Sequence, residues 1–434
     1  MKTTHARRCG LAATALLTAV TLGGCGGSDA PDASADAGRP LPTASIPRDS
    51  TASTGEPKAI AAGDARPVPE QGSPEWLLEE IVRIRIEPFP KETDLKKITE
   101  VQAQRNRRIV GLASEAVQQT HGDPDRKASF ATAVRHLLEA RLQLALHGDR
   151  DHIDALYEDA ESLFKRSPKS EEAAAAAFTV ARFAHANARR FAQKEPRWIE
   201  EFARQAKHFA EHFPQDEPQA APLLFAAAQS CELNGLNDEA KVCYALLQER
   251  FPENAQGQAA VAVLRRLELP GNPLELSGPT IDGGQVDMED YRGRAVLVVF
   301  WSTTASGFTE KIETVRQAIA GHPPESLVVV GVNLDEDESA IDAFLEQHFV
   351  DRAERADASG AAPEASRERR RLPWKHIFYA QPDQRGWENP IVQRFGVHEI
   401  PQFWLVDRQG NVISIDLEPE NLAEAIAQAV GVPR

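Results

Sequence analysis

The sequence predicts a multidomain protein in which an all-α helical-repeat domain precedes an α/β three-layer domain. Three observations lead to this prediction. At 434 residues, the chain is long enough for two or three domains that each bury a core. Between residues 73 and 269 no convincing strand occurs, and helical stretches of about 15 to 25 residues recur. Beyond Pro270 the pattern changes to strands that alternate with helices, which is typical of an α/β domain.

Composition excludes several function classes. The formal net charge of −16 argues against nucleic acid as a partner. The four cysteines are Cys9, Cys25, Cys231 and Cys243, and their number and spacing fit no metal-thiolate site. The sequence therefore predicts no nucleic-acid partner, no metal site and no cofactor.

Residues 1–24 have the pattern of a secretion signal, with a basic start, an apolar core over Leu11–Val20 and small residues before Cys25. The apolar core is too short to cross a bilayer. The run Leu22-Gly23-Gly24-Cys25 resembles a bacterial lipobox, which implies that Cys25 is lipidated and becomes the mature N-terminus. An ordinary signal peptide cleaved nearby is the alternative.

Residues 25–72 are predicted to be the lipidated cysteine followed by a disordered tether. They are rich in Gly, Ser, Asp, Ala and Pro, and such a composition cannot bury enough apolar surface to offset the entropy lost on ordering. We therefore expect a protein of the bacterial cell envelope, held to a membrane through its N-terminal lipid and facing the periplasm or the exterior.

Residues 73–269 are predicted to form the helical domain. Its first helix is expected to begin after Ser73, because a serine N-cap is followed by Pro74 at the first helical position. A proline disfavours helix at the residue before it, so four dipeptides mark breaks between helices. They are Asp123-Pro124, Ser167-Pro168, Phe213-Pro214 and Phe251-Pro252.

Residues 221–254 resemble one tetratricopeptide repeat. Gly235, Ala240 and Pro252 occupy the turn, helix-contact and terminating positions of that motif, and Tyr244 stands where an aromatic is usual. The resemblance implies an α-solenoid of paired helices whose concave surface binds a protein or peptide. A purely structural helical spacer is the alternative, because the prolines upstream are irregularly spaced.

Cys231 and Cys243 lie on opposite sides of the turn Asn234–Asn237, and hence on the two helices of one predicted hairpin. A disulfide between them and a pair of small buried thiols are both left open at this point, since facing helices usually lie slightly too far apart for a relaxed bridge.

Residues 272–434 are predicted to form the α/β domain. Arg294–Trp301 is a continuous apolar run, which is typical of a central strand covered on both faces. The elements expected after it are a helix (Gly307–Ala320), a strand (Leu327–Leu334), a helix (Glu338–His348), an irregular stretch (Asp351–Arg371), a short strand (His376–Tyr379), a helix (Asn389–Phe395), a hairpin (Gln402–Asp416) and a final helix from Glu418.

Several motifs in this domain appear in the order of a known family. Ile281–Val286 and Tyr291–Arg294 precede the first central strand, while Val397–Pro401 is followed by Phe403–Asp407. Residues 272–432 thereby resemble the TlpA/ResA-like branch of the thioredoxin-fold proteins, the redoxin or AhpC/TSA-like group. The resemblance implies a thioredoxin-like fold in which Pro401 forms a cis-proline loop beside the active-site turn.

The family's two active-site cysteines are missing. Aligning its Trp-Cys-x-x-Cys motif with this chain places the tryptophan at Thr304 and the cysteines at Ala305 and Phe308. Thiol exchange requires a thiolate at the start of the first long helix and a second thiol that resolves the mixed disulfide. Ser306 matches neither cysteine, and a serine without an adjacent base is a poor nucleophile. We therefore predict no catalytic residue at this site.

The retained cis-proline loop is compatible with a groove that binds an extended peptide. The alternative is that the proline only shapes the turn, whatever binds there. The predicted binding residues are Trp301, Thr304, Ser306, Gly307, Ile400 and Pro401.

The sequence thus favours a membrane-anchored binding or scaffold lipoprotein that is redox-inactive and has a protein or peptide partner in the cell envelope. The alternative is a thiol-disulfide oxidoreductase of the TlpA/ResA type in cell-envelope redox homeostasis. That activity would need sulfur from elsewhere, such as Cys231 and Cys243.

Overall fold

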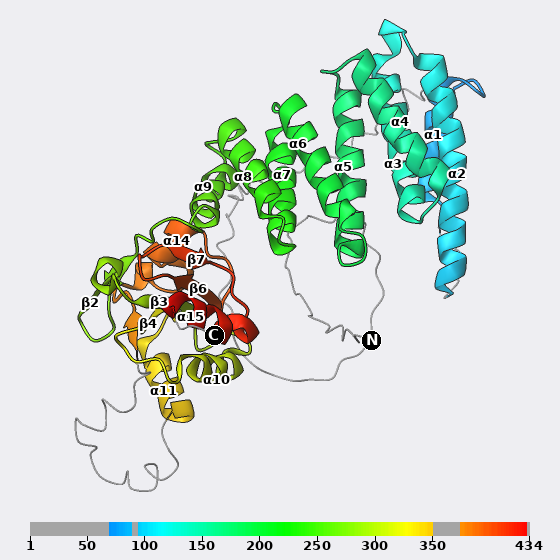
Figure 1. Cartoon of the computed structure of the whole chain (residues 1–434). Coiled ribbons are helices and arrows are strands. Elements are labelled where there is room, and N and C mark those ends of the chain that lie inside the picture. The colour runs from blue at the N-terminus through cyan, green and yellow to red at the C-terminus, as the bar shows by residue number, and fades with distance from the viewer. Residues whose placement is uncertain (1–68, 89–93, 350–373, 432–434) are drawn as a thin grey trace, which may run out of the picture. The chain divides into compact units, whose positions relative to one another are not determined.

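Consecutive helices pack against one another through the first part of the computed structural model, which describes residues 69–88, 94–349 and 374–431 (Figure 1). We call residues 74–267 the helical region. Its α-helices are α1 (Pro74–Ile86), α2 (Leu95–Thr120), α3 (Lys127–Leu146), α4 (Arg150–Arg166), α5 (Glu171–Phe191), α6 (Arg197–His212), α7 (Glu217–Leu233), α8 (Asn237–Arg250) and α9 (Ala255–Leu267).

Local sequence explains where these helices begin and end. The Ser73 side chain accepts a hydrogen bond from the backbone N–H of Trp76 (3.3 Å), so α1 starts at the predicted cap. The turn between α7 and α8 contains Gly235 at φ 75°, a left-handed conformation that glycine adopts without strain. The hairpin predicted around this turn is therefore present.

Small side chains allow the helices of this region to approach closely. Ala176 on α5 and Ala227 on α7 are fully buried, and both belong to alanine-rich helices. Large aromatic side chains fill the space between helices, as Phe202 and Phe209 of α6 do. The helical region therefore has a packed interior of its own.

A mixed sheet of strand order β5-β4-β3-β6-β7 forms the centre of the second part of the chain, which we call the C-terminal domain. β3 pairs in parallel with β4 and antiparallel with β6, so it lies in the middle of the sheet as its apolar run predicts. The strands are β3 (Ala295–Trp301), β4 (Leu327–Asn333), β5 (Lys375–Ile377), β6 (Gln402–Val406) and β7 (Val412–Ser414). A separate hairpin, β1 (Ser277–Pro279) with β2 (Gln285–Asp287), was not predicted from the sequence.

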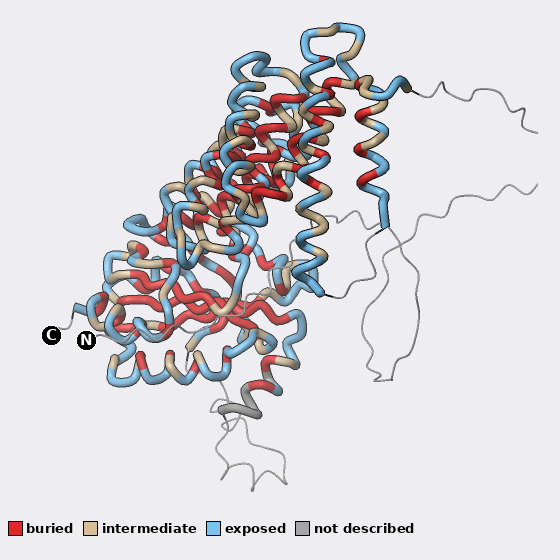
Figure 2. Tube along the Cα trace, turned by 90° about the vertical axis from the view of Figure 1, so that its right-hand side faces the viewer, coloured by how far each residue is buried: buried red, intermediate tan, exposed pale blue. Residues whose placement is uncertain are grey.

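Helices cover both faces of the sheet. Leu297 and Val299 of β3 pack in one cluster with residues of α10, α11 and α15, whereas Val298 and Phe300 pack in another with residues of α14. The sheet is therefore a buried layer between two helical layers, as the red strands of Figure 2 show. The helices of this domain are α10 (Phe308–Ile319), α11 (Glu338–Phe349), α14 (Pro390–Phe395) and α15 (Leu422–Val430), with 3-10 turns η2 (Met288–Tyr291), η3 (Pro382–Gln384), η4 (Gly386–Glu388) and η5 (Pro419–Asn421). A further 3-10 turn, η1 (Pro124–Arg126), precedes α3 in the helical region.

The hydrophobic core on the α14 face of the sheet continues into the helical region. One cluster of buried side chains joins Leu224 of α7 and Leu267 of α9 with Phe395 of α14 and Trp404 of β6. The described residues of the two regions accordingly belong to one compact unit. The fold class predicted from the sequence, a helical region followed by a thioredoxin-like α/β domain, is confirmed.

None of the helices in the described residues combines the length and the hydrophobicity that crossing a bilayer requires. The predicted signal, lipidation site and tether, together with the irregular stretch Asp351–Arg371, lie outside the described residues.

Candidate functional site

Two loops that are distant in sequence meet at one end of the central strands. β3 and β6 run antiparallel with Phe300 opposite Gln402, so the residues after β3 lie beside those that precede β6. The first loop, residues 302–308, is called the 302–308 turn here. The second is the proline corner, Ile400–Pro401, whose peptide bond is cis as the family resemblance implies. The predicted groove residues are thus brought together.

An aromatic stack contains Phe308, the residue that the motif alignment places at the family's second cysteine. Phe308 is 1% exposed, and its ring stacks on that of Trp301 with centroids 4.8 Å apart and planes 16° apart. The ring of Phe344 lies 5.9 Å from that of Phe308. Position 308 therefore has no sulfur and is part of an apolar interior.

Trp301 itself is 0% exposed. The prediction that its side chain contributes to a binding surface is wrong, because the tryptophan ends a strand that is covered on both faces and points into the core. Thr304, Ser306 and Gly307 are exposed, and Ile400 and Pro401 are half-buried. These five predicted residues can contact a partner.

Asp335 holds the first residues of the 302–308 turn, Ser302 and Thr303, by hydrogen bonds. Its carboxylate is 4% exposed and accepts hydrogen bonds from Ser302 Oγ (2.8 Å), Thr303 Oγ1 (2.7 Å) and the Thr303 backbone N–H (3.0 Å). The side-chain amide of Asn333 donates to it as well (2.7 Å). This buried charge is thus stabilised by several donors around it.

The same network argues against serine or threonine chemistry in the turn. Ser302 is 3% exposed, so a substrate cannot reach its hydroxyl. Asp335, which accepts the Ser302 hydrogen bond, also accepts hydrogen bonds from the backbone N–H and hydroxyl of Thr303 and from the amide of Asn333. Among the described residues, no histidine is hydrogen-bonded to Asp335, so no base is in place to activate the serine. Sequence reasoning missed Asp335, although polar residues that directly follow a buried strand were a signal that could have found it.

The start of α10 is the place where the family's thiolate would lie. Gly307 caps the helix in a left-handed conformation (φ 71°), and no side chain caps it. The exposed Ser306 precedes it. This helix end can attract a hydrogen-bond acceptor of a ligand, but it supplies no nucleophile.

The two cysteines of the helical region are free thiols in this structure, and both are fully buried. Burial raises the pKa of Cys231 to about 11 and that of Cys243 to about 12. Thiolate is therefore scarce at neutral pH, which disfavours attack on a disulfide. No group of three or more His, Cys, Asp or Glu side chains in the described part of the chain is placed to hold a metal ion.

Helix α9 of the helical region is bonded to the segment that leads to the proline corner. Arg265 donates to the backbone carbonyl of Arg394 (2.6 Å), and Arg266 donates to that of Phe395 (3.2 Å). These carbonyls belong to the last turn of α14, where helical partners are lacking. Arg266 also forms a buried ion pair with Glu232 of α7 (2.6 Å). Nothing in the local sequence pattern signals these contacts.

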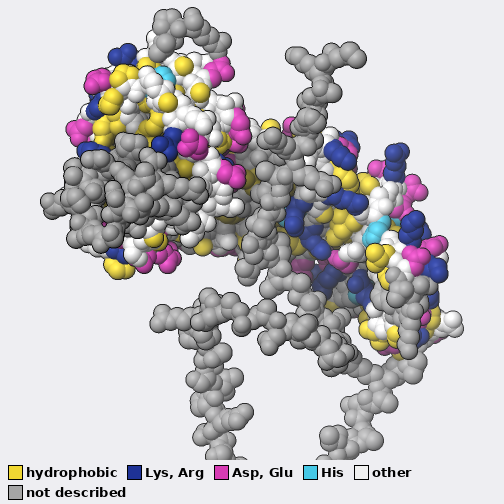
Figure 3. Space-filling view, turned by 90° about the horizontal axis from the view of Figure 1, so that it is seen from below, with side chains coloured by type: hydrophobic (Ala, Val, Ile, Leu, Met, Phe, Trp, Pro, Cys, Tyr) yellow, Lys and Arg dark blue, Asp and Glu magenta, His cyan; other side chains and the backbone are white. Residues whose placement is uncertain are grey.

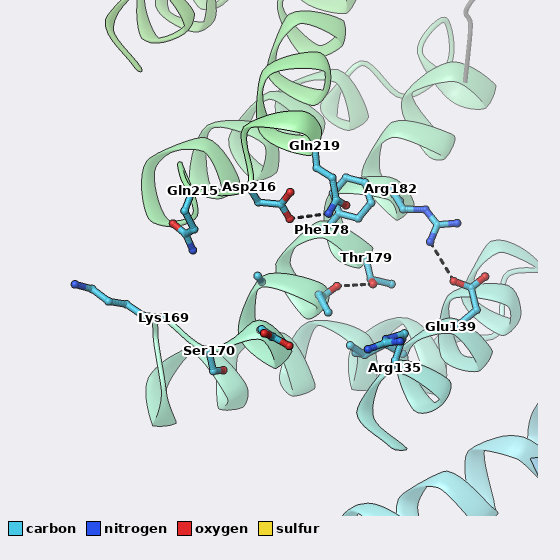
Figure 4. A pocket seen from close by; sticks show the side chains of 14 residues that line it. Arg135, Glu139, Lys169, Ser170, Phe178, Thr179, Arg182, Gln215, Asp216 and Gln219 are labelled. Carbon is cyan, nitrogen blue, oxygen red and sulfur yellow. Dashed lines mark hydrogen bonds and ion pairs between the residues drawn. The ribbon is translucent and has the colours of Figure 1, made fainter. Parts of the chain in front are cut away.

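The helical region has a groove of about 550 Å³ between α3, α5 and the segment before α7 (Figure 4). Leu138 and Phe178 supply apolar surface, and Arg182 donates to Glu139 across it (3.0 Å). Its charges are mixed, as they are on the surface drawn in Figure 3, where Lys and Arg are interspersed with Asp and Glu. The groove has room for a peptide but gives no indication of its sequence.

The C-terminal domain is similar to known proteins. Residues 270–415 match the AhpC/TSA family. The chain is similar to the thioredoxin domain of a thiol-disulfide oxidoreductase from Bacteroides vulgatus, at 17% identity over 37% of this chain and 98% of that one, with a TM-score of 0.29. It is similar to a protein from Chlorobium tepidum described as thiol:disulfide interchange protein DsbE, at 20% identity over 37% and 98% of the two chains, with a TM-score of 0.28.

A third similar structure is a secreted disulfide oxidoreductase from Mycobacterium tuberculosis, at 14% identity over 36% of this chain and 96% of that one, with a TM-score of 0.26. No curated protein matches the chain. The match to the AhpC/TSA family lies within the C-terminal domain, which has a thioredoxin-like fold and no cysteine in its 302–308 turn.

Proposed function

We propose that this protein is a membrane-anchored binding or scaffold protein of the bacterial cell envelope whose thioredoxin-like domain is redox-inactive. One observation carries the proposal. Phe308 takes the place of a family cysteine and is stacked on Trp301 inside the core, so the site lacks sulfur and also lacks the space that a reacting disulfide would need. With Ala305 at the other position, no thiol is available at the head of α10.

Binding at the same place is supported by the surface that remains. Thr304, Ser306 and Gly307 are exposed beside the proline corner, and together they offer hydroxyl and backbone groups to an extended peptide. Because the Asp335 network and the aromatic stack fix the turn on its inner side, this surface is held in one geometry. A rigid surface loses little entropy when it binds.

The alternative is a thiol-disulfide oxidoreductase of the TlpA/ResA type. Its sulfur would have to come from Cys231 and Cys243, which are fully buried in the helical region and have raised pKa values. We therefore favour binding over exchange.

Photo-crosslinking tests the binding role. In cells, p-benzoylphenylalanine replaces Thr304 or Ser306, and the matched control replaces the exposed Glu420 of η5. We expect the first two positions to yield the same discrete adducts and the control to yield none of them. Adducts should persist in Cys231→Ser/Cys243→Ser, because binding uses no thiol. Identical adducts at all three positions, or adducts lost with the cysteines, would contradict the proposal.

The membrane anchor has its own test. We expect the full chain to fractionate with membranes and to carry lipid on Cys25, and we expect Cys25→Ser to leave the membrane fraction. Membrane association that is unchanged in Cys25→Ser would show that another feature anchors the protein.

A further inference from the structure

A cavity of about 180 Å³ lies where the helical region meets the C-terminal domain, next to the proline corner. We call it the junction cavity. Leu233 and Arg266 line it from α7 and α9, while Glu399 and Gln402 line it from either side of Ile400–Pro401. The segment after β7 supplies Asp416 and Glu418. A peptide that follows the proline corner therefore passes this cavity.

The floor of the junction cavity is made of buried polar side chains. Arg266 is 2% exposed, and its charge is neutralised by Glu232 at 2.6 Å. Gln402 is 6% exposed, and its Oε1 accepts a hydrogen bond from Trp404 Nε1 (3.2 Å). The amide nitrogen of Gln402 has no hydrogen-bond partner among the described residues. This amide nitrogen is not itself buried, and because the side chain lines the cavity it can donate to an acceptor of a ligand.

The rim of the cavity is negatively charged. Glu399, Asp416 and Glu418 are exposed, and none of them forms an ion pair with a described residue. Because Arg266 is already paired with Glu232, the charge that remains at the rim is negative. An uncompensated group of carboxylates beside a hollow favours a cationic ligand.

One wall of the cavity is apolar. Leu233 is 54% exposed at the tip of the α7–α8 hairpin, which is unusual for a large aliphatic side chain, and the buried Leu267 and Ile415 also line the cavity. An aliphatic wall with carboxylates at its edge matches the side chains of lysine and arginine, whose apolar stems bury while the charged ends reach polar groups. A metal ion fits less well, because the described residues contain no group of three metal ligands.

We propose that the junction cavity binds a lysine or arginine side chain of an extended peptide that lies along the proline corner. This inference rests on the proposed binding function and names the residue that the partner must present. The aliphatic stem packs on Leu233, and the cation meets the carboxylates of Glu399, Asp416 and Glu418. The Gln402 amide nitrogen donates to a backbone carbonyl of the same peptide, since a cationic side chain offers no acceptor.

The test uses the purified full chain and a positional-scanning library of nine-residue peptides in which each position is scanned with lysine, arginine, norleucine and glutamate. Norleucine is the matched control for lysine, because it keeps most of the aliphatic stem and lacks the charge. We expect lysine and arginine to be selected over norleucine about tenfold at one position. The preference should fall to about unity in Glu399→Gln/Asp416→Asn/Glu418→Gln.

A second triple variant, Glu310→Gln/Asp383→Asn/Glu420→Gln, changes the net charge equally at exposed sites outside the cavity and should keep the preference. Equal thermal unfolding midpoints show that both variants fold. Peptide binding without a basic preference, or a preference that survives the first triple variant, overturns this inference and leaves the binding function standing. No binding of any peptide, together with the absence of crosslinks at positions 304 and 306, would contradict both proposals.

Discussion

The 302–308 turn and the proline corner are neighbours at the end of the same two strands, yet their surroundings differ. The turn is closed from within, because Phe308 stacks on Trp301 and Asp335 binds Ser302 and Thr303. The proline corner lies beside an open cavity with an unpaired amide donor and unpaired carboxylates. The 302–308 turn is thus packed on its inner side, whereas the cavity beside the proline corner has polar groups without a protein partner.

Under the proposed function, this difference means that recognition does not depend on exchange chemistry at the same end of the sheet. Position 308 holds a large ring that is buried against Trp301. Thiol-disulfide exchange depends on two sulfur atoms at the start of one helix. Peptide recognition depends instead on backbone groups and on side chains at the edge of the cavity, which come from several segments. The proposed binding role therefore needs no sulfur at the head of α10.

The largest expected effect is on stability, and it follows from a substitution in the packed interior of the 302–308 turn. Phe308→Ala should lower the free energy of unfolding by about 4 kcal/mol, because it removes a buried ring and leaves a cavity beside Trp301. Urea unfolding followed by tryptophan fluorescence measures the loss. The exposed neighbour Thr309→Ala is the control and should change stability by about 0.5 kcal/mol or less. A loss no greater than that of the control would show that position 308 is loosely packed.

On the open side, Arg266→Ala should cost about 3 kcal/mol, because it leaves the Glu232 carboxylate buried without its partner and removes a donor from the end of α14. Arg265→Ala, an exposed donor to the adjacent carbonyl, should cost far less. The double variant Arg266→Met/Glu232→Gln should recover part of the loss. Equal costs at 265 and 266 would contradict a junction held by the buried pair.

The reactivity of the two thiols in the helical region tests whether any accessible sulfur is present there. At pH 8, Cys231 and Cys243 in the folded protein should react with Ellman's reagent at least about a hundredfold more slowly than in urea, because burial blocks access and raises their pKa values to about 11 and 12. Cys25→Ser and Cys9→Ser remove the other thiols from the measurement. Fast reaction in the folded state would place an accessible thiol in the helical region.

The smallest effect is expected at the base of the turn. Asp335→Asn should destabilise the protein by about 2 kcal/mol, because an amide cannot accept all the hydrogen bonds from Ser302, Thr303 and Asn333. Asp383→Asn at an exposed site is the matched control. Hydrogen exchange at the Thr303 amide, which donates to Asp335, should quicken in the variant. Unchanged protection would show that the carboxylate does not hold the turn.

Much of the fold follows from local pattern. The apolar run at the centre of the C-terminal domain predicts a doubly covered strand, and β3 (Ala295–Trp301) is that strand. Serine and proline at positions 73 and 74 predict the start of α1. The short hairpin of β1 and β2 was missed, since three-residue strands have too few residues for an alternating pattern.

The site was only partly predictable. Aligning the family's motif with the sequence singled out Ala305 and Phe308, because the motif has a fixed spacing that can be laid on the chain whatever residues stand there. The contacts of Arg266 with Glu232 and Phe395 join segments far apart in the chain, and they leave no trace in composition or periodicity. Tertiary partners of this kind depend on how helices dock, which sequence pattern alone does not specify.

The most direct test of redox inactivity is insulin reduction by the full chain in the presence of dithiothreitol, compared with reagent alone and with Cys231→Ser/Cys243→Ser. We predict the same rate in all three, because no accessible thiolate exists at the head of α10 and the described cysteines are buried. Turnover by the wild type that is lost in the cysteine variant would contradict this and establish the oxidoreductase alternative.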